Sequence, residues 1–152
     1  MDHESDHVAA VSLDIRAPAE RVWEALTDPD LVQRYFHGTR VTTDWRVGSA
    51  ITWEGTWNGS AYQDKGQVLA FDPPRLLSTT HWSPLAGAED RPENYHTVTY
   101  RLSEAGGVTT LTLHQTNNPS QEAADAMAQN GWLPILRGLR SLVEGLAGTE
   151  PG

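Results

Sequence analysis

The last third of the chain most constrains the fold, because a strand pattern there runs directly into a helix pattern. Apolar and polar residues alternate over 108–116, with Leu111 and Leu113 on one face, as in a half-buried strand. The segment Asn-Pro-Ser-Gln-Glu at 118–122 then ends the strand and begins a helix. Apolar residues recur at helical spacing over 127–146. Because this helix follows every strand, we expect it to pack across a finished sheet and to leave a cavity beneath it.

The length of 152 residues indicates one domain with a substantial core. We place that domain at residues 8–147. The polar, acidic segment 1–7 and the short segment 148–152 are expected to be disordered tails.

Charge and composition exclude several classes of function. The net charge of −9 disfavours nucleic acid or an anionic membrane as a partner, since both require a basic surface. Without cysteine the chain cannot form disulfides or use thiolate chemistry. There is no apolar run long enough for stable membrane insertion, and the N-terminus lacks the pattern of a signal peptide. The sequence therefore predicts a cytoplasmic location.

The remaining patterns predict a strand, two short helices, about six more strands and the final helix. A first strand over 8–16 alternates, and the pairs Ala17-Pro18 and Asp28-Pro29 begin the two helices. Asn58-Gly59 is a strong signal for a tight hairpin. The later strands are expected at 40–44, 50–57, 62–71, 76–82, 94–103 and 108–116. This order predicts an α+β fold with an antiparallel sheet.

Three segments carry a resemblance to a known family. They are VSLDIRAPAERVWEALTDPDLVQRYF near the start, VLAFDPPRLLSTTHW in the middle, and VTTLTLHQTNNPSQEAADAMAQNGWLPILRGLRSLVEG at the end. In this order they resemble the SRPBCC, or START-like, superfamily, and most of all its bacterial branch related to the activator of the heat-shock-protein-90 ATPase. The resemblance implies a helix-grip fold, in which a curved antiparallel sheet of six to seven strands wraps around the long C-terminal helix. It also implies a hydrophobic cavity for lipids, sterols, polyketides or plant hormones, and in some members polyketide cyclisation.

Tryptophan supplies the main signal for a ligand site. The chain has six, and a tryptophan offers a large apolar surface with one N–H donor, which suits a pocket for an aromatic ligand. Simple core packing is the alternative, and we expect it for Trp23. The predicted ligand-binding residues lie on inward strand faces and on the final helix: Ile51, Trp53, Trp57, Trp82, His96, Val98, Tyr100, Gln115, Met127, Trp132 and Ile135.

Catalytic signals are weak. His96, Tyr100, Gln115 and Asp64 are possible inward ionisable or polar groups, but they form no recognisable pair or triad in the sequence. His81 and His96 are expected to face each other across a hairpin, but no metal-binding spacing accompanies them. We therefore predict no metal, no cofactor and no catalytic residues.

Pro134 inside the final helix predicts either a kink near Gly131 or a simple irregular turn, since proline removes a backbone N–H.

The sequence leaves three functions open. The first is binding of a small hydrophobic or aromatic ligand, such as a lipid, polyketide or flavonoid-like molecule, between sheet and helix. The second is an enzyme of the polyketide cyclase or aromatase type, with His96 or Tyr100 as its ionisable group. The third is a stress-related module that contacts a chaperone or a second copy of itself.

Overall fold

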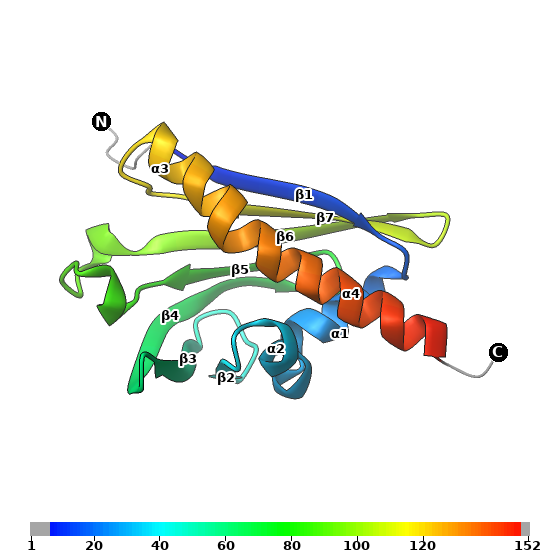
Figure 1. The fold of residues 1–152 in the computed structure, drawn as a ribbon, viewed down its shortest axis with the longest axis horizontal. Helices are drawn as coiled ribbons and strands as arrows, with labels where there is room; N and C mark the ends of the chain where they lie inside the picture. Colours follow the sequence, from blue (N-terminus) through cyan, green and yellow to red (C-terminus); the bar gives the residue numbers. More distant parts are fainter. Residues whose placement is uncertain (1–6, 150–152) are drawn as a thin grey trace.

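The computed structural model describes residues 7–149, except for the side chains of Trp57, Ala86 and residues 146–149. A single antiparallel sheet of seven strands in the order β1-β7-β6-β5-β4-β3-β2 forms one layer, and the C-terminal helix lies diagonally across one of its faces (Figure 1). The strands are β1 (Ala9–Ile15), β2 (Arg40–Thr43), β3 (Ala50–Trp57), β4 (Ser60–Asp72), β5 (Leu76–His81), β6 (His96–Ala105) and β7 (Val108–Gln115). The predicted α+β helix-grip fold is confirmed.

The strand boundaries lie within two residues of the predicted ones, and β6 begins and ends two residues later than predicted. β4 is longer than predicted, and β5 ends one residue early at His81. Trp82 still joins Lys65 in an isolated antiparallel bridge beyond the end of β5. Asn58 and Gly59 both take positive φ angles, 50° and 82°, as a tight hairpin turn between β3 and β4 requires.

Two short helices follow β1 and cover one end of the sheet. They are α1 (Ala19–Thr27) and α2 (Pro29–Tyr35). The Glu104 carboxylate accepts a hydrogen bond of 2.8 Å from the backbone N–H of Ala19, at the start of α1. The Asp28 carboxylate accepts one of 2.9 Å from the backbone N–H of Asp30, which caps α2. Trp23 on α1 is buried in the core, in agreement with its predicted packing role.

The C-terminal helix consists of α3 (Gln121–Ala126), a π-helical turn η3 (Met127–Trp132) and α4 (Leu133–Thr149). Between η3 and α4 the backbone N–H of Leu133 donates to the carbonyl of Ala128, five residues earlier. Pro134 follows directly and has no N–H for the carbonyl four residues before it, so an α-helical hydrogen bond is missing at this place. The irregularity predicted from Pro134 is therefore a π turn immediately before it.

The apolar core has two parts. The larger part joins β1, β6 and β7 to α1 and the C-terminal helix, with Leu111, Leu136 and Leu139 almost fully buried. The smaller part consists of Val32, Val41, Ile51 and Val68, from α2 and from strands β2 to β4.

Outside these elements, the loop 83–95 contains two single 3-10 turns, η1 (Pro84–Ala86) and η2 (Pro92–Asn94). No helix in the described part of the chain is long and apolar enough to cross a bilayer. The predicted tails at 1–7 and 148–152 fall largely outside the described residues, so the domain limits stay a prediction.

Candidate ligand-binding pocket

A cavity of about 490 Å³ lies between the sheet, α2 and the C-terminal helix, with loop 83–95 along one side. This volume lies within the range of small-molecule sites, about 300–1,000 Å³. Most of the lining is aliphatic or aromatic, and ten polar side chains interrupt it. The lining residues that carry the argument below are Tyr35, Phe36, His37, Thr39, Tyr62, Asp64, His81 and Leu85, together with those predicted from sequence.

The structure brings together ten of the eleven predicted ligand-binding residues around this one cavity. The ten lining residues are Ile51, Trp53, Trp82, His96, Val98, Tyr100, Gln115, Met127, Trp132 and Ile135. The eleventh, Trp57, pairs through its backbone with Ser60 at the end of β3, but its side chain lies outside the described residues. A role for these residues in ligand binding remains a proposal.

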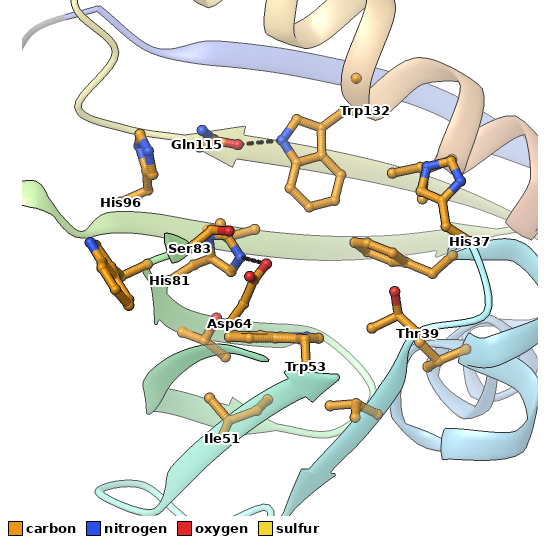
Figure 2. A pocket seen from close by; sticks show the side chains of 18 of the residues that line it. His37, Thr39, Ile51, Trp53, Asp64, His81, Ser83, His96, Gln115 and Trp132 are labelled. Atoms are coloured by element: carbon orange, nitrogen blue, oxygen red, sulfur yellow. Dashed lines mark hydrogen bonds and ion pairs between the residues drawn. The ribbon is translucent and has the colours of Figure 1, made fainter. Parts of the chain in front are cut away.

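One polar contact joins the helix to the sheet inside the pocket. The indole N–H of Trp132 donates a hydrogen bond of 2.5 Å to Oε1 of Gln115 (Figure 2). Gln115 is 5% exposed, and this bond fixes the direction of its amide. The amide nitrogen has no hydrogen-bond partner among residues 7–149 and therefore offers donors for a ligand.

Two partly buried phenols of the pocket, Tyr35 and Tyr100, are neutral at physiological pH. Burial raises the pKa of the Tyr100 hydroxyl well above its usual range. The pKa of Tyr35 is also raised well above its usual range, mainly by burial and further by the nearby Tyr100. The Tyr35 hydroxyl donates to the backbone carbonyl of Ala25 at 2.6 Å. Tyr100 packs edge-on to the Trp132 ring, with 6.3 Å between ring centroids. Neither phenol can serve as a base near pH 7.

Four side chains form a row across strands β3 to β6, which we call the cross-strand row: Trp53, Asp64, His81 and His96 (Figure 2). Trp53 is paired with Asp64 across β3 and β4, and His81 is paired with His96 across β5 and β6. The expected facing of the two histidines is thus confirmed. The Asp64 carboxylate lies 2.9 Å from Nε2 of His81, whose ring packs edge-on against Trp53 at 4.9 Å.

The tautomer of His96 follows from its hydrogen bond. Its Nδ1 lies 2.8 Å from the backbone carbonyl of Thr116, which can only accept, so Nδ1 carries the proton. In the neutral ring Nε2 is then an acceptor. Within the described residues, no group of three or more His, Asp or Glu side chains is placed to hold a metal ion.

Loop 83–95 and η3 each place a solvent-exposed apolar side chain in the pocket lining. Leu85 and Met127 line the pocket from these two segments, although 56% and 40% of their surfaces are exposed. The loop is held from within, because the indole N–H of Trp82 donates to the carbonyls of Ala88 and Glu89 at 3.2 and 3.1 Å. An ion pair between Lys65 and Asp90 adds a second attachment.

Sequence reasoning missed the wall that the turn between α2 and β2 provides. Phe36, His37 and Thr39 all line the cavity, and the Thr39 hydroxyl lies 3.2 Å from the hydroxyl of Tyr62 on β4. Gly38 was the only local signal there, and it marks the turn without indicating which side chains face the cavity. Phe36 also packs edge-on to Trp132, which explains how this turn meets the C-terminal helix.

Solved structures with this fold come from several bacteria. A solution structure of ChR145 from Cytophaga hutchinsonii is 39% identical, with a TM-score of 0.83, and the match covers 97% of this chain and 100% of that one. The crystal structure of CalU16 from Micromonospora echinospora is 26% identical, with a TM-score of 0.70 over 93% of this chain and 78% of that one. The Aha1 dimer from Colwellia psychrerythraea, at 19% identity and a TM-score of 0.70, shares the fold over 90% of this chain and 96% of that one.

The curated proteins include no match to this chain. The family described as "Activator of Hsp90 ATPase homolog 1-like protein" matches residues 16–144, which span every strand but β1 and nearly all of the C-terminal helix. This match agrees with the helix-grip topology and with the relatives of the same fold. The chain therefore belongs to the Activator of Hsp90 ATPase homolog 1-like family.

Proposed function

We propose that this protein binds a small hydrophobic or aromatic ligand, such as a lipid, polyketide or flavonoid-like molecule, in the pocket between sheet and C-terminal helix. The observation that carries the proposal is a cavity of about 490 Å³ lined by aromatic and aliphatic side chains from both layers of the fold. Such a lining favours the transfer of apolar surface from water by about 25 cal/mol per Å² buried.

Two polar groups of the pocket support an amphipathic ligand over a pure hydrocarbon. The free amide N–H groups of Gln115 are donors, and Nε2 of neutral His96 is an acceptor. An aromatic molecule with carbonyl and hydroxyl groups can satisfy both, whereas a plain alkyl chain leaves them without partners, which is costly in a buried site.

The test is an amide NMR titration of the labelled protein with fatty acids, sterols, flavonoids and polycyclic aromatic compounds. We expect shifts clustered on 51–53, 96–100 and 127–135 for one chemical class. Val98→Phe should abolish them, because Val98 is 4% exposed and its larger replacement must enter the cavity. The matched control Val47→Phe lies at a position that is 66% exposed and outside the pocket. Equal binding by both variants, or no binding by the folded wild type, would refute the proposal.

Self-association or contact with a chaperone is a second candidate. It is supported by the dimeric state of the Aha1 relative from Colwellia psychrerythraea and by the family's description. Sedimentation at several protein concentrations tests the first form, and a binding assay with purified Hsp90 tests the second. A concentration-independent monomer that does not bind Hsp90 would exclude this candidate and leave ligand binding untouched.

A further inference from the structure

A carboxylate–imidazole pair lines the same pocket. Oδ2 of Asp64 on β4 lies 2.9 Å from Nε2 of His81 at the end of β5. Their side chains are 15% and 29% exposed, so the pair is largely screened from bulk water. A pair of this kind at a protein surface is a weak ion pair, but here it lies inside an apolar cavity large enough for a substrate.

The local backbone holds the two side chains together. Lys65 and Trp82, which directly follow Asp64 and His81 in the chain, exchange backbone hydrogen bonds of 2.9 and 2.8 Å. Gly66 allows this approach, because a Cβ there would lie 1.8 Å from the carbonyl oxygen of Thr80. The pair is thus built on two strands in close contact, which is the rigid support that a reactive group requires.

The hydrogen bond also fixes which nitrogen of His81 can react. An ionised carboxylate only accepts, so Nε2 carries the proton and donates it to Asp64. Nδ1 of the neutral ring is then unprotonated, and it has no hydrogen-bond partner among residues 7–149. The edge-on contact with Trp53 at 4.9 Å restricts rotation of the ring. A free, oriented imidazole nitrogen with a carboxylate behind it is the arrangement of a general base.

We infer that His81 is a catalytic general base that removes an acidic proton from the carbon next to the carbonyl group of a bound aromatic ketone, with Asp64 as its positioning residue. The C–H bond breaks, Nδ1 of His81 takes the proton, and the electron pair passes into the carbonyl to give an enolate. The proton on Nδ1 exchanges with solvent, and His81 then delivers a solvent-derived proton to the carbon, so the step needs no oxidant, reductant or second substrate. Asp64 stabilises the imidazolium while the enolate exists.

The pocket also holds a donor for the enolate oxygen. The Gln115 amide, oriented by Trp132, has N–H groups without a partner among the described residues. Neutral N–H donors aimed at a developing oxyanion lower the barrier without competing for the proton. The inference rests on the proposed function, since the ketone must first enter the pocket.

Proton exchange on 2-tetralone in D₂O tests the inference. This bicyclic ketone has acidic protons at C1, and their replacement by deuterium is followed by proton NMR, while its binding is followed by amide shifts of the labelled protein. We expect the protein to accelerate exchange. His81→Gln should slow the protein-dependent rate at saturation by about 100-fold, the usual share of a general base, and leave the dissociation constant unchanged.

Two further variants separate the roles. Asp64→Asn should also lower the saturated rate with unchanged binding, and it should shift the pH profile of exchange, which a purely structural role would not do. His114→Gln is the matched control, because His114 lies on β7 outside the pocket, and it should exchange at the wild-type rate. Binding of 2-tetralone without accelerated exchange, or exchange unaffected by His81→Gln, would overturn the inference alone. No binding of 2-tetralone would also overturn the inference, whereas the proposed function would fail only if the titration with fatty acids, sterols, flavonoids and polycyclic aromatic compounds showed no binding either.

Discussion

Replacing Gly66 with alanine should destabilise the protein strongly, and the size of the effect follows from the geometry of β4 and β5. The added Cβ would lie 1.8 Å from the carbonyl oxygen and 2.6 Å from the carbonyl carbon of Thr80. Both atoms belong to the backbone, so no side-chain rotation can relieve the contact. The strands must separate, which breaks the two backbone hydrogen bonds between Lys65 and Trp82. Overpacking at about 1–3 kcal/mol and two lost hydrogen bonds at about 1 kcal/mol each give a total of about 3–5 kcal/mol.

The matched control is Gly145→Ala on α4. Outside the neighbouring residues and the adjacent turns of the helix backbone, no atom of the described residues lies within 4 Å of a Cβ at this position, and alanine is the better helix former, so we expect a gain of about 0.5–1 kcal/mol. Urea unfolding followed by tryptophan fluorescence measures both variants. A loss below about 1 kcal/mol for Gly66→Ala would contradict the reasoning, because this would mean that β4 and β5 separate at little cost.

Three further predictions concern the helix, the pocket and the loop. Ser120→Ala removes the hydroxyl that accepts from the N–H of Ala123 at 3.0 Å, and should cost about 1 kcal/mol in urea unfolding. Trp132→Phe leaves the Gln115 carbonyl oxygen without its donor and should lower the free energy of unfolding by about 1–3 kcal/mol. Ligand addition should move the Gln115 side-chain amide signals downfield in the wild type, and this change should be lost in Trp132→Phe. Hydrogen bonds from Lys65 and then from Tyr95 lower the pKa of Asp90 below its usual value of 3.8, so their contribution to loop order is present above that pH and is lost as pH falls through the lowered pKa. In ¹⁵N-labelled protein, the indole N–H signal of Trp82 should therefore stay constant from pH 5 to 8 and shift below about pH 4. The same signal should not shift below pH 4 in Asp90→Asn.

The inward faces of the strands could be predicted from sequence because period-two alternation fixes them. Ile51 and Trp53 on β3, and His96, Val98 and Tyr100 on β6, share one face each and line one cavity as expected. The hairpin at Asn58-Gly59 was equally accessible, since both residues tolerate positive φ. These features depend only on local patterns, and a sequence contains them directly.

The pairing of Asp64 with His81 could not be predicted in the same way. It depends on the register between β4 and β5, which shifts between Val68 and Ala70, so counting residues along the two strands does not place the two side chains opposite each other. Nothing in the local sequence distinguishes Gly66 from an ordinary strand glycine, although its role is the close approach of two backbones. Such a contact joins segments that are distant in the chain, and a local pattern carries no information about it.

The π turn η3 explains how residues that an ordinary helix would separate come to share the pocket. In an α-helix five residues advance by about 500°, so Met127 and Trp132 would point about 140° apart. Both line the pocket, because the wider turn between them, with its hydrogen bond from Leu133 to Ala128, advances less per residue. The missing N–H of Pro134 favours this turn, and the turn aims the Trp132 indole at Gln115. A proline outside the cavity lining therefore sets the direction of the one hydrogen bond that orients the pocket's amide donor.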